Sequence, residues 1–241
     1  MNKYPTTLFK QKSEQLNIHL EETQIQQFIE YYELLAEWNK VMNLTAITEY
    51  EDVIEKHFID SLSLVKVYDL SSEKKVIDIG TGAGFPGIPL KIAFPQLDIV
   101  LLDSLNKRIK FLNTVTKQLG LEKVKAVHGR AEDFARQKEY RESFDLCVSR
   151  AVANLSTLSE YCLPFVKQGG AFIPYKSGKI EEEVSQAGNA VKKLGGKITD
   201  VVKFQLADTD MDRSFVIIAK EKRTPGTYPR KAGLPGKEPL K

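Results

Sequence analysis

The 241-residue sequence contains no long uninterrupted run of apolar residues, and this absence excludes several classes of protein. No window approaches the roughly 20 apolar residues that a membrane-spanning helix requires. The first ten residues, MNKYPTTLFK, contain no apolar run of signal-peptide length. We therefore expect a cytoplasmic protein with no membrane partner.

Cysteine is almost absent, because the chain has only Cys147 and Cys162. Both lie among apolar residues, and their spacing fits neither a C-x-x-C motif nor a disulfide framework. We expect them to pack in the core, and we expect no metal site.

An excess of charge of one sign is also missing, since the net charge of +3 is too small to indicate a nucleic-acid partner. The distribution is uneven, however. Residues 1–75 carry 8 basic and 13 acidic side chains, whereas residues 220–241 carry 7 and 2. The last residues, 224–241, are rich in proline and glycine, so we expect a solvated basic tail that forms no helix.

The first 70 residues are predicted to form a helical extension. In residues 23–44 the apolar side chains recur at helical spacing, on one face. Thr48 and Glu51 have the spacing of a capping box before a second predicted helix that ends near Val67.

From Lys75 onward, short apolar runs alternate with helical stretches, which is typical of βα units on a parallel sheet. The predicted strands are 75–80, 98–103, 124–129, 144–149 and 170–176, and the helices are 86–93, 104–119, 131–137, 153–166 and 179–194. Two further strands, 197–206 and 214–222, follow without a helix between them. This hairpin predicts an antiparallel last strand in a mostly parallel, seven-stranded, Rossmann-like sheet. It favours an α/β class I methyltransferase domain over 71–223.

The stretch VIDIGTGAGFPGIPLKI, residues 76–92, supports two interpretations. Counted from Gly82 it contains the dinucleotide fingerprint G-x-G-x-x-G, and counted from Asp78 it reads D-x-G-x-G-x-G. A dinucleotide needs backbone N–H groups at the next helix to hold its pyrophosphate, and Pro86 has none. S-adenosylmethionine has no phosphate, so the loop suits this cofactor better.

Acidic residues end the first two strands. Asp78 is placed to act near the cofactor's ammonium group, and Gly80, Gly82 and Gly84 let the backbone pass beside its methionine part. Asp103 is placed to accept from both ribose hydroxyls, although NAD would use such an acid in the same way. An NAD-dependent oxidoreductase is therefore the alternative function.

The next two strands also end in candidate residues. Ala131 and Glu132 follow the third strand, where they could meet the adenine, although an acid in a first helical turn is favoured in any case. Arg150 and Ala151 follow the fourth strand, where the substrate should meet the methyl group. An arginine does not suit amine methylation, and Cys147 lies inside the strand, which leaves an already nucleophilic acceptor such as N(7) of guanine.

Several motifs together resemble one family. They are EWNKVMNLTAIT, KHFIDSL, DIGTGAGFPGIPLKI, DSLNKRIKFL, GRAED, SRAVA and YPRKAGLPGKEPL. From about Ile25 to Leu240 the chain resembles the bacterial small-subunit ribosomal RNA methyltransferase G family, also called glucose-inhibited division protein B. The resemblance implies a cytoplasmic enzyme that uses S-adenosyl-L-methionine to methylate N(7) of one guanine in the 530 loop of 16S ribosomal RNA, either naked or in the small subunit.

The resemblance also implies roles for individual residues. The positions that match the family's cofactor contacts are Gly80, Phe85, Ala131, Glu132 and Arg150. Asn39, His57 and Asp60 lie in its N-terminal motifs and are candidates for the pocket, although each could equally be structural. Lys176, after Tyr175, is a further candidate catalytic residue. A non-catalytic RNA-binding assembly factor with this fold is the remaining alternative. Independently of that alternative, we expect that removing residues 224–241 weakens RNA binding and its salt dependence and leaves cofactor binding intact.

Overall fold

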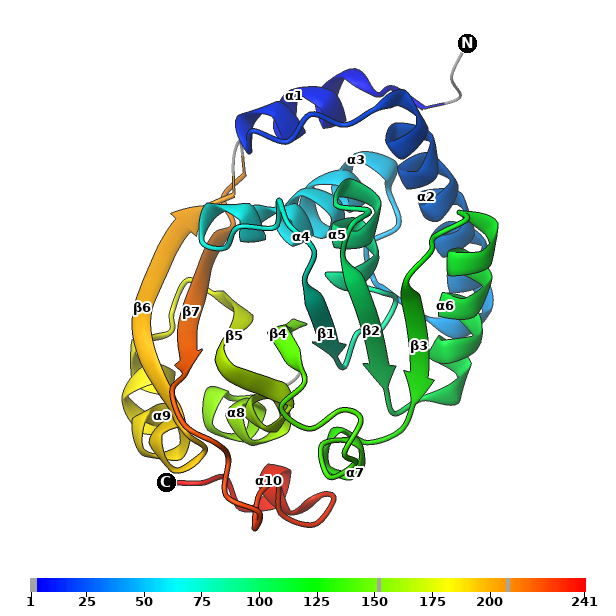
Figure 1. Cartoon of the computed structure of the whole chain (residues 1–241). Coiled ribbons are helices and arrows are strands. Elements are labelled where there is room, and N and C mark those ends of the chain that lie inside the picture. Colours follow the sequence, from blue (N-terminus) through cyan, green and yellow to red (C-terminus); the bar gives the residue numbers. More distant parts are fainter. Residues whose placement is uncertain (1–3, 151–152, 207–208) are drawn as a thin grey trace.

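The computed structural model describes residues 4–150, 153–206 and 209–241. Within these ranges, seven strands form one sheet in the order β3-β2-β1-β4-β5-β7-β6 (Figure 1). Its first five strands are mutually parallel, and β7 is antiparallel to both of its neighbours. The strands are β1 Lys75–Ile79, β2 Asp98–Asp103, β3 Val124–His128, β4 Phe144–Arg150, β5 Val166–Ser177, β6 Gly196–Gln205 and β7 Asp212–Lys220. The predicted fold class is thus confirmed.

The region between α8 and β5 differs from its prediction. Helix α8 ends at Cys162 instead of reaching residue 166, because Pro164 cannot continue an α-helix and lies in a 3₁₀ turn over Leu163–Phe165. Strand β5 then begins at Val166 instead of the predicted residue 170, so it includes Gly169 and Gly170. A bulge in its pairing with β4 accommodates them.

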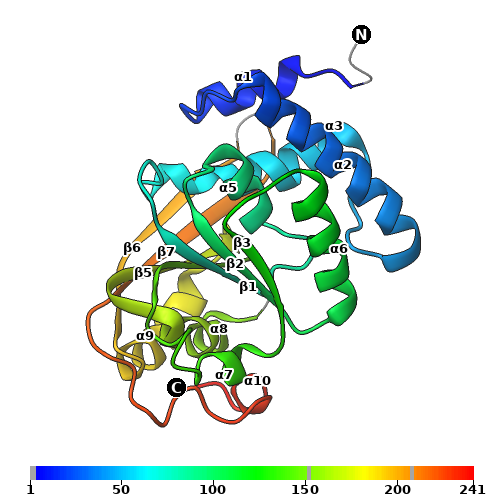
Figure 2. The same cartoon turned by 45° about the vertical axis from the view of Figure 1, so that its right-hand side comes forward.

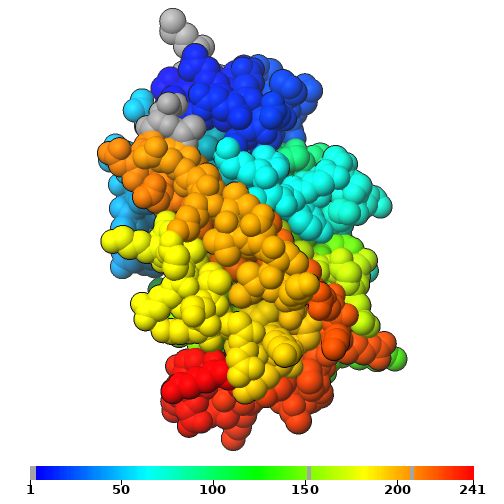
Figure 3. Space-filling view, turned by 90° about the vertical axis from the view of Figure 1, so that its left-hand side faces the viewer, coloured from blue at the N-terminus to red at the C-terminus, as the bar shows by residue number. Residues whose placement is uncertain are grey.

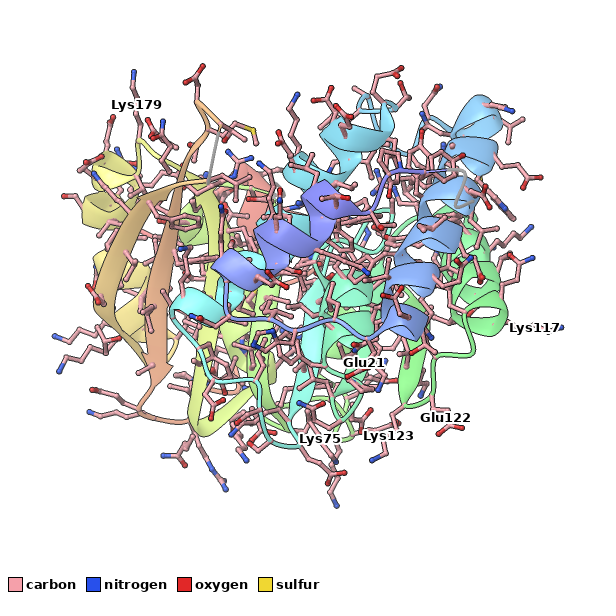
Figure 4. All side chains as sticks on the ribbon, turned by 90° about the horizontal axis from the view of Figure 1, so that it is seen from above. Glu21, Lys75, Lys117, Glu122, Lys123 and Lys179 are labelled. Atoms are coloured by element: carbon pink, nitrogen blue, oxygen red, sulfur yellow. The ribbon has the colours of Figure 1, made fainter. Side chains whose placement is uncertain are left out.

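The order of the strands reverses beside β1, which pairs with β2 on one side and with β4 on the other. In open α/β sheets, ligands bind at such a reversal, outside the carboxyl ends of the strands. Figure 4 shows Lys75 and Lys123, which lie at the amino ends of β1 and β3, on the side of the molecule away from Lys179, which follows β5. We therefore expect a ligand to bind at the edge of the sheet where β1, β2 and β4 end.

Helices cover both faces of the sheet. On one face α5 and α6 pack in a single apolar core with the N-terminal helices, and on the other face α8 and α9 pack in a second core. Figure 2 shows the N-terminal helices lying over α5 and α6. The helices of the two layers are α5 Gly87–Ala93, α6 Asn106–Gln118, α7 Ala131–Phe134, α8 Leu155–Cys162 and α9 Glu181–Lys193. No helix in the described residues is both long and apolar enough to cross a membrane.

The N-terminal extension is less regular than predicted. Helices α1 (Thr7–Gln15) and α2 (Glu22–Met42) are followed by α3 (Tyr50–Val53), a π-helical segment over Ile54–Ile59, α4 (Asp60–Leu62) and a 3₁₀ turn over Ser63–Lys66. The expected capping box is wrong, because the first helical turn begins after Glu49 with no side-chain cap. The π-helical segment contains His57, and such widened turns are frequent at functional sites.

The C-terminal segment, residues 224–241, does not lie free in solvent as expected. Leu234–Lys237 form one helical turn, α10, and the backbone carbonyl of Lys241 accepts bonds from two side chains of α9. Figure 3 shows these last residues against the part of the surface that contains α9. Proline and glycine prevented a long helix, but they do not prevent the segment from packing. The division into 1–70, 71–223 and 224–241 stays a prediction, although one core crosses its first boundary.

Candidate active site

The glycine loop after β1 turns sharply into α5. Gly80, Gly82 and Gly84 all have positive φ, and a Cβ at Gly84 would lie only 2.6 Å from the side chain of Ile88. Glycine is therefore required here both for the backbone conformation and for close packing. Pro86 immediately precedes the helix.

Backbone N–H groups of this loop are committed to partners inside the protein. The N–H groups of Gly84 and Phe85 donate to the carbonyl of Thr81, and the N–H of Gly87 donates to Oδ2 of Asp78. Ile88, the next helical residue, donates to the carbonyl of Gly84. A pyrophosphate would need such groups free, so this geometry disfavours the dinucleotide interpretation.

Asp78 is completely buried at the end of β1. Its Oδ2 accepts from the hydroxyl of Thr81 at 2.7 Å and from the N–H of Gly87 at 2.9 Å. Its Oδ1 is, within the described residues, the one buried side-chain polar atom without a hydrogen-bond partner. Burial raises the pKa of this carboxyl to about 6, against the lowering effect of those two bonds and of Arg150. An unpartnered buried acceptor fits a cationic donor such as an ammonium group.

Asp103 is also buried, at the end of β2. Its Oδ2 accepts from the N–H of Gly82 at 2.9 Å and from Arg108 at 3.1 Å, and its Oδ1 accepts from the N–H of Leu105. The carboxylate therefore fixes the glycine loop against the start of α6. Each carboxylate oxygen has two lone pairs, and both of those on Oδ2 are used, so Oδ1 can still accept from one hydroxyl group.

Two adjoining hollows form the cleft at this edge, and they share Gly80, Asp103 and Ser104. The smaller, of about 150 Å³, extends toward β3 and is also lined by Ile79, Leu102, Gly129, Arg130, Ala131, Glu132 and Tyr161. The larger, of about 420 Å³, extends toward the N-terminal helices and is also lined by Leu44, Thr45, His57, Thr81, Gly82, Ala83, Phe85, Arg108 and Arg150. The cleft thus brings together most of the predicted site residues.

Glu132 lies in the first turn of α7, at the smaller hollow, and is only 4% exposed. Its Oε1 accepts from the backbone N–H of Gly233 at 2.8 Å. The carboxylate is therefore held by the C-terminal segment, through a contact that no local sequence pattern indicates.

Arg150, at the end of β4, is held by the π-helical segment. Its Nη1 donates to Oδ2 of Asp60 at 2.8 Å and to the carbonyl of Lys56 at 3.3 Å. Its Nη2 donates to Nδ1 of His57 at 3.1 Å, and the guanidinium lies 5.0 Å above the ring centroid of Phe85. The cation is therefore fixed at the mouth of the larger hollow.

His57 is neutral in this environment. Burial and the Arg150 cation lower its pKa to about 3. Because Nδ1 accepts from Arg150, the ring proton is on Nε2, which lies 2.8 Å from the hydroxyl of Thr45. The ring also stacks on Phe85, with centroids 4.4 Å apart.

Asn39 lines neither hollow, but it contacts Thr45, which lines the larger one. Its side chain bonds both the N–H and the carbonyl of Thr45, each at 2.9 Å. Asn39 is therefore placed to fix the loop that carries Thr45 and, through it, the ring of His57.

Lys176 is not brought into this cluster. Its ammonium donates to the carbonyl of Ala153 at 2.8 Å and to Glu183 of α9 at 2.6 Å, and it lines neither hollow. Cys147 is fully buried inside β4, as expected. Ala151 lies outside the described residues.

Sequence reasoning missed three contributors to the site: Thr81, Thr45 and Arg213. Thr81 stands inside the glycine motif and could have been singled out as a partner for Asp78. Arg213, at the start of β7, donates to Oδ1 of Asp60 at 2.7 Å from 153 residues away, and no local pattern indicates this. In the described part of the chain, no cluster of three His, Cys, Asp or Glu side chains could hold a metal ion.

Solved structures of other proteins share the fold of this chain. Among solved structures, TYW2 from M. jannaschii in complex with AdoMet superposes with a TM-score of 0.54 at 17% identity, over 74% of this chain and 79% of that one. A Haloferax volcanii methyltransferase solved with its Trm112 activator gives a TM-score of 0.59 at 12% identity, over 78% and 98%. At these identities the likeness concerns the fold alone.

Sequence relatives are much more similar. The Ribosomal RNA small subunit methyltransferase G of Lachnoclostridium phytofermentans is 56% identical over 232 residues, which is 96% of each chain. That of Desulforamulus reducens is 51% identical over 240 residues, 100% of each. The family model described as GidB, rRNA small subunit methyltransferase G, matches residues 24–214. The chain therefore belongs to the rRNA small subunit methyltransferase G family.

Proposed function

We propose that this chain transfers a methyl group from S-adenosylmethionine to N(7) of one guanine in the 530 loop of 16S ribosomal RNA, in the cytoplasm. Family membership supports the reaction and the class of substrate. The single observation that carries the proposal is that two groups end neighbouring strands at the carboxyl edge where the cleft lies: Asp78, whose buried Oδ1 has no hydrogen-bond partner among the described residues, and Arg150, whose guanidinium is held by Asp60.

The residues of the cleft fit the cofactor. When bound, S-adenosylmethionine supplies a methyl group on a cationic sulfonium. Asp78 would hold the ammonium group, and Oδ1 of Asp103 would accept from a ribose hydroxyl. Gly80, Gly82 and Phe85 would line the methionine part, and Ala131 and Glu132 would line the adenosine part.

The side chains at the other end of the cleft suit an acceptor that needs no base. N(7) of guanine already carries a free lone pair, so catalysis consists mainly of alignment. Both ring nitrogens of His57 have partners, and its pKa of about 3 makes it a poor proton acceptor at neutral pH. The residue therefore orients Arg150 instead of removing a proton.

Arg150 retains binding capacity toward the substrate. Its contacts with described residues use three of the five N–H groups of the guanidinium. The others can donate to O(6) of guanine or to a phosphate. An arginine held in this way would fix the base relative to the methyl group.

Labelled methyl transfer to small subunits or to 16S ribosomal RNA tests the proposal. We expect incorporation by the natural chain and its loss in Gly80→Asp, because the new side chain would occupy the cleft. Gly120→Asp is the matched control, since Gly120 has a similar positive φ, in a turn where a Cβ would meet nothing within 4 Å. Absence of transfer by the natural chain to either substrate would favour a non-catalytic assembly factor.

Calorimetry distinguishes an S-adenosylmethionine site from an NAD site. S-adenosylhomocysteine should bind to the chain, and NADH should not. Saturable binding of NADH alone would contradict the proposal and support the oxidoreductase interpretation.

A further inference from the structure

The C-terminal segment lies at the adenosine end of the cleft, beside α7 and α8 (Figure 1). It comes from the end of the chain, and its Gly233 lies 101 residues after Glu132 of the cleft. Its basic composition suggested an RNA-binding arm, but its contacts with the protein indicate a different role.

The segment is anchored by one buried ion pair. Arg230 donates to the carboxylate of Glu160 from Nε, from Nη2 and from its backbone N–H, at 2.7 to 3.1 Å. Glu160 is completely buried in α8. A bidentate pair with this burial fixes the geometry of both partners, so Arg230 is not available to bind a phosphate.

Further contacts secure the segment before Arg230. The guanidinium of Arg141 donates to the carbonyls of Thr224 and Tyr228 at 2.8 and 2.9 Å, and Arg136 donates to the carbonyl of Pro229. The buried ammonium of Lys220 donates to the hydroxyl of Thr224 at 2.7 Å. The path of the chain toward the cleft is therefore fixed by the domain itself.

Beyond Arg230, the segment contacts two residues that line the smaller hollow. The N–H of Gly233 donates to Oε1 of Glu132 at 2.8 Å. A Cβ built at Gly236 would lie 3.3 Å from the hydroxyl of Tyr161, so the backbone passes close behind that side chain. Both Glu132 and Tyr161 line the hollow assigned to the adenosine part.

We propose that the C-terminal segment is part of the cofactor site, with the Gly233 peptide as the group that positions the carboxylate of Glu132 for the nucleoside end of the ligand. This inference rests on the proposed function. Gly233 has a φ of +84°, which glycine adopts without strain, and this conformation presents its N–H to Glu132. Without that bond, the carboxylate would lose the donor that holds it in place, and ligand affinity would fall.

Truncation of the full chain provides the first test. Deleting residues 232–241 removes Gly233 but keeps Arg230 and its pair with Glu160. Deleting only residues 239–241 is the matched control, because it keeps Gly233 and removes the contacts of Lys241 with α9. We expect the Kd of S-adenosylhomocysteine to rise about tenfold in the longer deletion, the size of one hydrogen bond to a charged group, and to stay near the natural value in the control.

Comparing two ligands shows which end of the cofactor site the deletion affects. 5′-Methylthioadenosine, which lacks the amino acid end, should lose affinity by the same factor as S-adenosylhomocysteine. A loss confined to S-adenosylhomocysteine would place the defect at the methionine end and overturn the inference. If the longer deletion fails to fold, Gly233→Ala replaces it in the full chain, since a Cβ there would meet no neighbouring atom but would disfavour the positive φ that presents the N–H to Glu132.

A double-mutant cycle separates positioning from general stability. In a Glu132→Ala background, the deletion should have little further effect on the Kd, because its target is already absent. An equal loss in both backgrounds, or an unchanged Kd with a lower melting temperature, would overturn the inference. Failure of the natural chain itself to bind S-adenosylhomocysteine would contradict the proposed function instead.

Discussion

Arg150 donates to Nδ1 of His57 across 93 residues of sequence, and this bond joins the end of β4 to the π-helical segment. The same guanidinium is paired with Asp60 from that region. The N-terminal extension therefore does more than cover the sheet, because it sets the position of the cation at the cleft.

The pairing makes the protein's stability depend on pH through His57. Its pKa is about 3 in the folded chain and about 6.5 when unfolded. Between these values the unfolded chain binds a proton that the folded chain does not, so the free energy of unfolding contributed by His57 falls as the pH falls below about 6.5. Urea denaturation between pH 7 and pH 5 should show this decrease.

His57→Gln should flatten that pH dependence, because glutamine does not titrate. His19→Gln is the control, since His19 is exposed. Identical slopes in the natural chain and in His57→Gln would contradict a neutral, buried His57.

Asp78 should make ligand binding depend on pH in the same range. Its pKa of about 6 means that the ionised form, which an ammonium group requires, is lost as the pH falls through about 6. The affinity for S-adenosylhomocysteine, measured by calorimetry, should therefore weaken below that pH. Asp78→Asn should bind weakly at every pH, and a variant that binds normally would exclude Asp78 as the ammonium partner.

Asp60 should contribute strongly to stability, because it is buried and pairs with both Arg150 and Arg213. Removing one member of a buried ion pair leaves the others uncompensated, so Asp60→Ala should lower the free energy of unfolding by about 3 kcal/mol. Asp52→Ala removes an exposed pair with Lys56 and should cost no more than about 0.5 kcal/mol. Equal urea midpoints for the two variants would refute this account of Asp60.

Substitutions of Lys176 and Arg150 should have different effects, on stability in the first case and on turnover in the second. Lys176→Met removes bonds to Glu183 and Ala153, which should lower the melting temperature while changing the turnover number by less than about twofold. Arg150→Met should lower turnover by about 100-fold, as is typical when a fixed donor is lost from an active site. A comparable loss of turnover in Lys176→Met would return this lysine to the catalytic site.

The sequence was sufficient for features that depend on neighbouring residues. The alternation of strands and helices, and the glycine loop with Asp78 before it, follow from local periodicity and from backbone conformations that glycine permits. The carboxyl edge of the sheet then brings Asp103 and Arg150 to one cleft and buries Asp78 at the same edge, because parallel strands end on the same side.

Other features depend on pairings between distant residues. The widened turn around His57 follows from packing, since a regular helix was equally compatible with its sequence. The bond from Gly233 to Glu132 spans 101 residues, and Pro-Gly composition alone cannot distinguish a packed segment from a solvated one. The C-terminal segment, which was expected to be a solvated tail, is the clearest example of a feature that depends on distant contacts.

The central claim concerns the atom that receives the methyl group, and mass mapping of the modified nucleotide tests it most directly. Small-subunit ribosomal RNA from cells lacking the modification would be incubated with the chain and S-adenosylmethionine, digested, and sequenced by mass spectrometry. The account predicts a single 7-methylguanosine in the 530 loop. Methylation of another base, of another atom of guanine, or of several scattered guanines would contradict it.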